Sequence, residues 1–246
     1  MATIRYSIIV PALEEEAVIG WTLDRLAIYL LSCDALEETE VIVVTADSKD
    51  NTAKIVKDRK SHFDHFQFIE PGPKVGKGRD VQAGIMAARG DYILFTDADL
   101  ATPEWHIMPA FKVLEEGSDI VIGVRNLRTI HHGYRVLISL GANLLTRLMV
   151  LPSVPDTQCG FKAFTKQSAH DIFEKLTVMG WGFDIEVLVI ARKLKLKLKK
   201  MPIRDWHDPK IDNGLVGESS WKASVRTLKE LIQIRKNRKQ GIYDKA

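Results

Sequence analysis

The sequence predicts an α/β protein in which a mixed, mostly parallel sheet is flanked by helices. Two observations lead to this fold class. Short apolar runs, each typical of a buried strand, recur at 6–10, 40–44, 66–69, 91–95 and 119–123. Segments of about 10–15 residues with helical character separate these runs. Strands that alternate with helices form βαβ units, so most of the strands should run parallel.

Three helices are expected between these strands, at 14–31, 50–58 and 80–88. Glu14–Glu16 should lie in the first turn of the first helix, where acids suit the helix dipole. Asp50-Asn51-Thr52 is a start signal for the second helix. The third follows a glycine-rich, basic loop that contains Lys77.

The second half of the chain is less regular. Residues 131–151 are expected to form a loop and then a helix, whose leucines pack on the sheet or lie in a membrane interface. Arg192–Lys200 alternates leucine with lysine, which predicts a strand with its leucines inward. From Trp221 to Ile232 apolar residues recur at helical spacing, so this basic helix should either cover the body or bind a membrane surface. Residues after about 241 are expected to be frayed.

The composition is that of an ordinary soluble protein, with 246 residues, 46% apolar and 27% charged. No window approaches the ~18 uninterrupted apolar residues of a membrane span, and no signal-peptide pattern opens the chain. Cys33 and Cys159 are too few for a disulfide framework. We expect both to be packed thiols in a reducing cytoplasm.

The charge is unevenly spread, although the net charge is only +3. Residues 192–239 hold 15 lysines and arginines against 5 acids, a balance of +10, so the rest of the chain carries −7. A basic C-terminal fifth predicts contact with an anionic surface, either a membrane or nucleic acid. No RNA- or DNA-binding motif accompanies these lysines, which disfavours a nucleic-acid-binding protein.

Two carboxylates, Asp97 and Asp99, follow the apolar run at 91–95. In a parallel α/β sheet the carboxyl end of a strand faces the ligand crevice. Oxygen ligands this close together suit Mg²⁺ or Mn²⁺, which could hold a diphosphate as well. An Asp-X-Asp motif alone more often forms a solvated turn with helix-capping aspartates. Other motifs in the chain are needed to distinguish a metal site from such a turn.

Six motifs occur in one order along the chain. They are Val10-Pro11-Ala12 followed by acids, Asp47-Ser48-Lys49-Asp50-Asn51-Thr52, Gly76-Lys77-Gly78, Asp97-Ala98-Asp99, Asp156-Thr157-Gln158-Cys159-Gly160-Phe161-Lys162, and Trp181-Gly182-Phe183-Asp184-Ile185-Glu186. Over about 6–243, this set resembles the family 2 inverting glycosyltransferases with the GT-A fold. The closer likeness is to polyprenyl-phosphate glycosyltransferases: dolichyl-phosphate glucosyltransferases first, dolichyl-phosphate mannose synthases second.

The resemblance implies a single GT-A (Rossmann-like) catalytic domain over 1–240 and a tail at 241–246. A nucleotide-sugar half would lie at about 1–125 and an acceptor half at about 126–240. The residues implied to hold the UDP- or GDP-hexose donor are Pro11, Ala12, Glu15, Asp47, Lys77, Asp97, Ala98 and Asp99. Asp99 is implied to be the main ligand of Mg²⁺ or Mn²⁺, with Asp97 beside it.

An acceptor site for the lipid phosphate is also implied by the resemblance. Its residues would be Arg125, Arg135, Ser139, Asp156, Asp184 and Glu186. The residues implied to be catalytic are Asp97, Asp99, Arg125 and Arg135. Trp206 and His207 match a loop that closes over the site in the family.

Three departures from the family pattern leave some identities open. Leu13-Glu14 stand where the family usually has Tyr-Asn. Thr45-Ala46-Asp47-Ser48 stands where Asp-Asp-Gly-Ser is usual, so the nucleobase stays open between UDP and GDP donors. Ala101 stands where mannose synthases often have Gln, as it does in the glucosyltransferase branch.

The acceptor also stays open at this point. A phosphate monoester has a second pKa near ~6 and is already largely dianionic at neutral pH, so it needs a cationic grip but no general base. A hydroxyl of a glycan or other soluble acceptor would need a base, for which Asp184 or Glu186 could serve. For a lipid acceptor, we expect peripheral binding at the cytoplasmic membrane face through helix Val136–Leu151 and the basic C-terminal segment.

Overall fold

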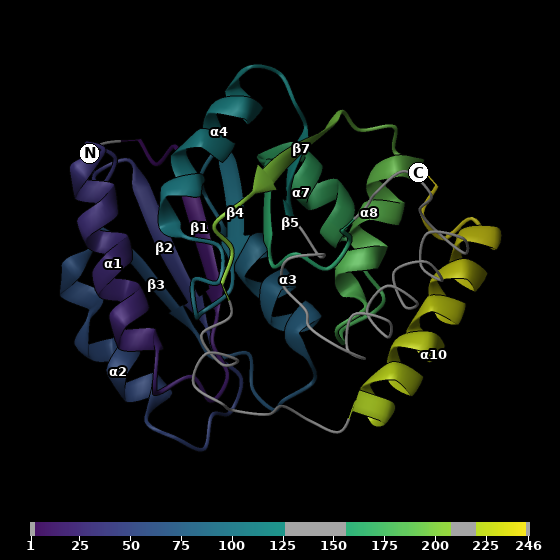
Figure 1. The fold of residues 1–246 in the computed structure, drawn as a ribbon, viewed down its shortest axis with the longest axis horizontal. Coiled ribbons are helices and arrows are strands. Elements are labelled where there is room, and N and C mark those ends of the chain that lie inside the picture. The colour runs from purple at the N-terminus through teal and green to yellow at the C-terminus, as the bar shows by residue number, and fades with distance from the viewer. Residues whose placement is uncertain (1–2, 126–155, 208–219, 245–246) are drawn as a thin grey trace.

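Seven strands form one sheet in the computed structural model, which describes residues 3–125, 156–207 and 220–244 (Figure 1). The strands are β1 (Tyr6–Pro11), β2 (Thr39–Val44), β3 (His65–Ile69), β4 (Tyr92–Thr96), β5 (Ile120–Arg125), β6 (Phe161–Thr165) and β7 (Leu198–Ile203). They lie in the order β3-β2-β1-β4-β6-β5-β7. All neighbours are parallel except those of β6, which runs antiparallel to β4 and β5. The prediction of a mixed, mostly parallel sheet is confirmed.

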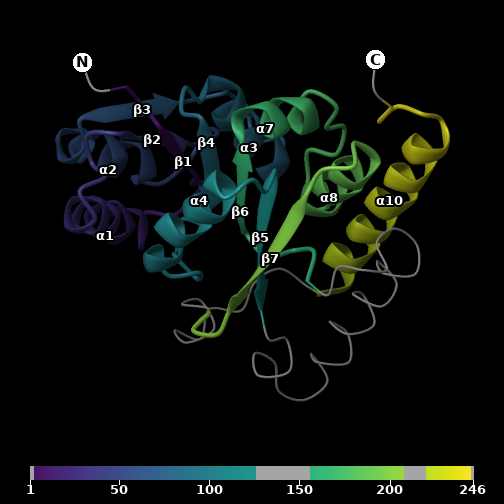
Figure 2. The same ribbon diagram turned by 90° about the horizontal axis from the view of Figure 1, so that it is seen from above.

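Helices cover both faces of the sheet. The α-helices of the described residues are α1 (Ile19–Ser32), α2 (Thr52–Asp58), α3 (Lys77–Ala87), α4 (Ile107–Glu115), α7 (Lys166–Phe173), α8 (Phe183–Lys193) and α10 (Ser220–Lys239). Two short 3-10 helices lie at Lys60–His62 and Glu104–His106. Figure 2 shows α1 and α4 on one side of the sheet and α3 and α7 on the other. α10 packs against the outer side of α8.

Side chains of the central strands alternate between two cores. In β1, Ile8 and Val10 join the core under α1 and α4, whereas Ile9 joins the core under α3 and α8. All three side chains are fully buried. A strand covered on both faces is mostly apolar, which is why β1 could be recognised as a nearly continuous apolar run.

One edge of the sheet gathers the loops that carry the six motifs. The carboxyl ends of β1, β2 and β4 meet there because these strands are parallel. β6 runs in the opposite direction and pairs Phe161 with Thr96. The segment 156–160 therefore reaches the same edge from the amino end of its strand.

Two helix starts differ from expectation. Glu14–Glu16 precede α1, which begins only at Ile19. Their backbone N–H groups instead donate to side chains of the loop after β2, for example Glu14 N to Ser48 Oγ at 3.0 Å. α3 begins at Lys77, three residues earlier than expected, so Lys77 is a helical residue.

Arg192–Lys200 is part helix and part strand, so the prediction of a continuous strand is wrong. Its first two residues end α8, Lys195 follows in a left-handed turn with φ 59°, and β7 begins at Leu198. The predicted burial still holds, because Leu194 and Leu196 are buried or half-buried and the lysines are exposed. Buried or half-buried leucines alternate with exposed lysines through both the turn and the start of β7. The alternation of leucine and lysine therefore did not distinguish a turn from a strand.

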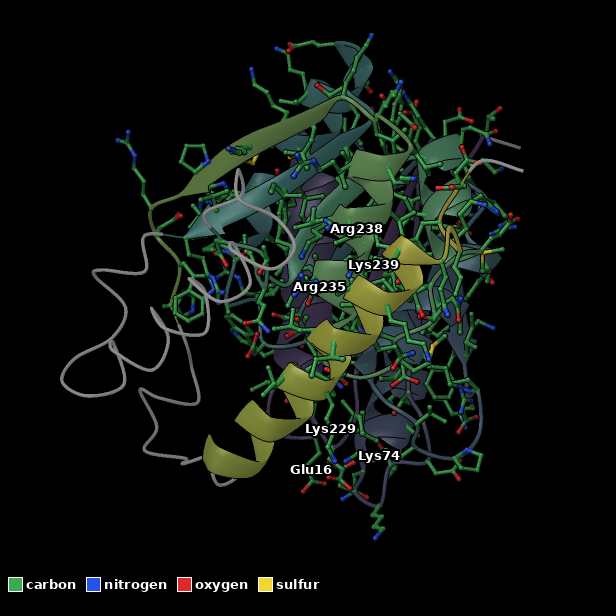
Figure 3. The ribbon with its side chains drawn as sticks, turned by 90° about the vertical axis from the view of Figure 1, so that its right-hand side faces the viewer. Glu16, Lys74, Lys229, Arg235, Arg238 and Lys239 are labelled. Carbon is green, nitrogen blue, oxygen red and sulfur yellow. The ribbon has the colours of Figure 1, made fainter. Side chains whose placement is uncertain are left out.

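α10 buries a narrower stripe than the sequence predicted. Leu231 and Ile234 are buried against the body, whereas Leu228 and Ile232 are 41% and 54% exposed. Figure 3 shows α10 lying along one side of the molecule. The basic residues labelled on it there are Lys229, Arg235, Arg238 and Lys239.

Tyr243, four residues after the end of α10, packs into the body, so the expectation of fraying from 241 is wrong for the described residues through Asp244. Tyr243 is fully buried. Its hydroxyl donates a hydrogen bond to Glu186 in α8. Tyr243 therefore belongs to the core.

The two cysteines differ in exposure. Cys159 is buried, as expected of a packed thiol, and burial raises its pKa to about 11. Cys33 is exposed, so the same expectation is wrong for Cys33. It follows the last turn of α1, whose outer face points to solvent.

Several expectations fall outside the described residues. They concern Arg135, Ser139 and the helix expected at 136–151. Within the part of the chain that the structure describes, none of the helices combines the length and the apolar character needed to span a bilayer.

Candidate active site

Asp97 and Asp99 follow β4 directly, and both are half-buried. Ala98 between them is buried. The carboxylate of Asp99 accepts a hydrogen bond from the backbone N–H of Ala101 at 3.1 Å. Gly160 lies against Asp97, and a Cβ there would be 2.1 Å from Asp97 Oδ2. Only glycine at this position lets the Asp97 carboxylate keep its place.

Lys77 brings a cation to Asp97. Its ammonium group forms an ion pair with Asp97 Oδ1, and its side chain is 16% exposed. Burial alone would lower the pKa of Lys77, but the carboxylates of Asp97 and Asp184 outweigh burial and raise that pKa above its ordinary value. The ammonium group is therefore charged at neutral pH. Gly78 N donates to Met179 O at 2.9 Å and fixes the start of α3.

A second cation–carboxylate pair lies beside the first. Lys162 in β6 places its Nζ 2.5 Å from Oδ1 of Asp184 in the first turn of α8, and both side chains are almost fully buried. Lys162 also donates to Cys159 O at 2.6 Å. Burial raises the pKa of Asp184, while Lys162 and Lys77 act in the opposite direction. Asp184 thus lies between the two lysines of the site.

A third pair joins the end of β5 to the segment before β6. Arg125 donates from Nε and Nη2 to the two carboxylate oxygens of Asp156, at 2.7 and 3.0 Å. Burial alone would raise the pKa of Asp156, but these bonds lower it below its ordinary value. The guanidinium group also lies 5.1 Å from the ring centroid of Trp206. Since two of its five N–H donors face Asp156, the guanidinium keeps donors for another anion.

The segments after β1 and β2 are held together at this edge. Ala12 N donates to the last residue of β2 at 2.8 Å, and Glu15 N donates to Thr52 Oγ1 at 2.9 Å. Pro11 and Ala12 are buried, whereas Asp47 is exposed. β1 lies between β2 and β4, so these predicted nucleoside contacts flank the carboxylates that follow β4.

Glu186 is engaged elsewhere. Its buried carboxylate accepts hydrogen bonds from the backbone N–H groups of Thr177 and Val178 and from the hydroxyl of Tyr243. These bonds tie the turn before α8 to the C-terminal residues. The structure therefore brings Lys77, Asp97 and Asp184 together without Glu186, whose acceptor role stays a prediction.

The loop after β7 approaches the site through its backbone. His207 N donates to Ala101 O at 3.1 Å. Asp205, two residues earlier, accepts a hydrogen bond from Trp105 Nε1 and pairs with His106 Nε2, both at 2.7 Å. The loop is thus joined to the segment that follows Asp99.

Sequence reasoning missed Lys162 and Trp181, although both lie in the motifs. Lys162 interrupts the apolar run of β6, and a buried lysine requires a partner, so the signal was present. The ring centroid of Trp181 lies 5.4 Å from the ammonium group of Lys77, and the side chain is 54% exposed. No sequence signal separates such a tryptophan from a core residue.

The two aspartates fit a hard divalent cation that is shared with a diphosphate. Within residues 3–125, 156–207 and 220–244, no three His, Cys, Asp or Glu side chains form a metal cluster. Mg²⁺ is commonly held by one or two carboxylates, with phosphates and water at the other positions. Asp97 pairs with Lys77, and the role of Asp99 as main ligand stays a prediction.

A family model described as glycosyl transferase family 2 matches residues 7–173, which is more than half of the chain. The chain belongs to glycosyl transferase family 2. The match includes β1 through α7 and the Asp97-Ala98-Asp99 motif. The resemblance seen in the six motifs is confirmed, and the protein is a glycosyltransferase.

Curated relatives extend the likeness over most of the chain. Dolichyl-phosphate beta-glucosyltransferase of Trichomonas vaginalis is 33% identical over 221 residues, which cover 84% of this chain and 67% of that protein. The protein of the same name from Homo sapiens is 31% identical over 253 residues, which cover 95% of this chain and 75% of that protein. The likeness to dolichyl-phosphate glucosyltransferases is therefore confirmed.

Solved structures confirm the GT-A fold. Glucosyl-3-phosphoglycerate synthase from Mycobacterium tuberculosis, in complex with uridine diphosphate, gives a TM-score of 0.68 at 18% identity and covers 94% of this chain and 80% of that chain. The same synthase with Mn²⁺, UDP-glucose and glycerol 3-phosphate gives a TM-score of 0.64 at 21% identity, with the same coverage. At such identities the likeness concerns the fold.

Proposed function

We propose that this glycosyltransferase moves glucose from UDP-glucose to a polyprenyl (dolichyl-type) phosphate, with inversion at the anomeric carbon and with Mg²⁺ or Mn²⁺. The observation that carries the proposal is the meeting of Asp97, Asp99 and Lys77 at the carboxyl edge of the sheet. The names of the relatives support glucose and the lipid phosphate. UDP in the structural neighbours supports the nucleotide.

The donor diphosphate would be neutralised between Asp99 and Lys77. A divalent cation on Asp99, with Asp97 beside it, would stabilise the negative charge that develops on the leaving group. Lys77 is charged, mostly buried and fixed at the start of α3, so it adds a preorganised cation to the same group. Pro11, Ala12, Glu15 and Asp47 flank this position and would hold the nucleoside.

Contacts at the site favour a phosphate acceptor over a hydroxyl. A hydroxyl would need a general base, but Asp184 is paired with Lys162, and Glu186 is bound to the turn before α8. A phosphate dianion needs only cations to bring it near the donor. Arg125 supplies a guanidinium whose remaining donors suit a phosphate. Arg135 and Ser139 would complete this grip.

The acceptor's polyprenyl chain places the enzyme at a membrane, and α10 offers a surface suited to one. Leu228 and Ile232 are exposed on it, together with Lys229, Arg235 and Lys239. Each lysine or arginine near an anionic leaflet contributes about 1 kcal/mol, screened by salt. The enzyme would bind the cytoplasmic face as a peripheral protein.

The donor and the metal are tested by a transfer assay with polyprenyl phosphate. UDP-glucose, GDP-glucose and GDP-mannose are compared with Mg²⁺, with Mn²⁺ and with excess chelator. We expect transfer from UDP-glucose, and a loss of about 100-fold or more in Asp99→Asn, because the leaving group loses its stabilisation. The matched control is Asp91→Asn, because Asp91 is an exposed acid directly before β4, the strand that Asp97 and Asp99 follow. Full activity in excess chelator would show that transfer needs no metal. Transfer to a hydroxyl acceptor, with none to polyprenyl phosphate, would refute the phosphate acceptor.

Membrane binding is tested by flotation with anionic liposomes. Arg235→Glu with Lys239→Glu should reduce binding at low salt, and rising salt should weaken binding of the wild type. The matched control makes the same charge reversal at two exposed lysines, Lys54 in α2 and Lys60 in the 3-10 helix that follows it. Both lie near the β3 edge of the sheet, away from α10. Equal loss in both double variants would show a nonspecific charge effect and contradict the assignment to α10.

A further inference from the structure

Trp181 is exposed directly before a buried segment. The two residues that follow it, Gly182 and Phe183, are buried, whereas the Trp181 side chain is 54% exposed. Its ring centroid lies 5.4 Å from the Lys77 ammonium, which pairs with Asp97. A large aromatic surface therefore faces solvent at the mouth of the site, next to the groups assigned to the donor diphosphate.

The turn that carries Trp181 is held in place by α10. Glu230 accepts a hydrogen bond from Gly182 N at 2.8 Å. Its carboxylate also lies so close to Gly180 that a Cβ there would be 2.1 Å from Glu230 Oε1. On the other side, Met179 O accepts from Gly78 N at the start of α3. An exposed side chain on a turn fixed from two sides is preorganised for a ligand, because little freedom is lost on binding.

Trp181 lies near the β6 side of β4, and this position determines which part of the donor its ring can contact. The predicted nucleoside contacts follow β1 and β2, on one side of β4. Trp181 begins the turn into α8, whose Asp184 pairs with Lys162 of β6, on the other side of β4. With the diphosphate between Asp99 and Lys77, the group beyond it on the β6 side is the hexose.

We propose that Trp181 is a platform on which the donor hexose stacks, and that Glu230 is the positioning residue that holds this platform beside Lys77. The inference rests on the proposed function, since it names the contact for the donor sugar. A glucopyranose ring has faces of axial C–H groups, because all its ring hydroxyls are equatorial, and such a face packs on an aromatic ring. Trp181 would thus contribute to hexose binding and contribute nothing to binding of UDP.

The test compares the binding of UDP-glucose with that of UDP by titration calorimetry without acceptor. Trp181→Ala should weaken UDP-glucose binding by about three- to tenfold, the size of one aromatic contact, and leave UDP binding unchanged. Trp181→Phe should retain most of the affinity. Trp21→Ala removes a tryptophan of similar exposure on α1 and should change neither ligand.

Glu230 is tested by the same two titrations. Glu230→Ala should weaken UDP-glucose binding and spare UDP, and its effect should vanish in the background of Trp181→Ala, because both act through one contact. Glu230→Gln keeps an acceptor for Gly182 N and should rescue most of the affinity. Additive losses in the double variant, or equal losses for UDP and UDP-glucose, would overturn the positioning role.

Failure of the inference can be told apart from failure of the proposed function. Wild type that binds UDP-glucose, with Trp181→Ala binding it equally well, would overturn the platform alone. Wild type that binds no UDP-sugar would overturn the proposed donor and the platform with it. Intrinsic fluorescence gives a second readout: UDP-glucose, but not UDP, should change the emission of wild type, and this difference should be lost in Trp181→Phe.

Discussion

Asp80→Asn is expected to stabilise the protein at neutral pH. Asp80 lies in the first turn of α3 and is 3% exposed, and its Oδ1 has no hydrogen-bond partner among the described residues. Burial raises its pKa from 3.8 to about 6, although Arg79 and Lys74 act against this rise. Ionisation of Asp80 therefore destabilises the folded state. Asparagine has a similar shape and no charge, so Asp80→Asn removes this destabilisation.

The size and the pH dependence follow from the two pKa values. Because the folded-state pKa is the higher one, the stability linked to this group is fully present below about pH 3.8 and is lost as the pH rises through about 6. The difference corresponds to about 3 kcal/mol at about pH 7.5 and about half of that at about pH 5. At roughly 2–4 °C per kcal/mol, Asp80→Asn should raise the melting temperature by roughly 6–12 °C near neutrality.

The assay is urea unfolding of both proteins at a series of pH values, with Asp91→Asn as the control at an exposed aspartate. The gain in unfolding free energy should shrink steadily as the pH falls. A gain that does not depend on pH would show that Asp80 is not the titrating group. A loss of stability in Asp80→Asn at neutral pH would refute the account of Asp80 as a buried, poorly compensated carboxylate.

Three further substitutions test the contacts around the site. Gly160→Ala should abolish most transfer in a folded protein, measured by initial rate and melting temperature, because its Cβ would displace the Asp97 carboxylate. Lys162→Met should lower the unfolding free energy by about 3–5 kcal/mol, and Asp184→Leu in the same chain should restore much of it; equal loss in the double variant would contradict this. Tyr243→Phe should cost about 1–3 kcal/mol by removing the donor to a buried carboxylate, and an unchanged urea midpoint would show that the bond adds nothing.

Most of the central sheet was predictable because burial on both faces leaves a signal in the chain itself. β1, β2 and β4 each contain a run of consecutive apolar residues. These runs are too short for a buried helix, so their length favours strands. β6 left no such signal, because Lys162 interrupts its apolar run. The direction of β6 was also out of reach, since strand direction depends on long-range pairing rather than on local pattern.

The motifs named residues that the structure brings together, but they did not name the pairs that these residues form. The motifs named Lys77, Asp97 and Asp184, and the structure places them together. The pairing of Asp184 with Lys162, and of Arg125 with Asp156, joins residues 22 and 31 positions apart. Such contacts are decided by sheet order and register, which one sequence does not display.

α10 shows why a correct period can still give the wrong buried residues. The predicted helix is present, yet the face that reaches the body holds Leu231 and Ile234 and leaves Leu228 and Ile232 exposed. The bond from Gly182 N to Glu230 places an acid on the side of α10 that faces α8. Charged residues of a surface helix are expected on its solvent face. The sequence therefore did not predict that Glu230 faces α8. Glu230 therefore joins α10 to the turn of Trp181, in addition to the apolar contacts of Leu231 and Ile234.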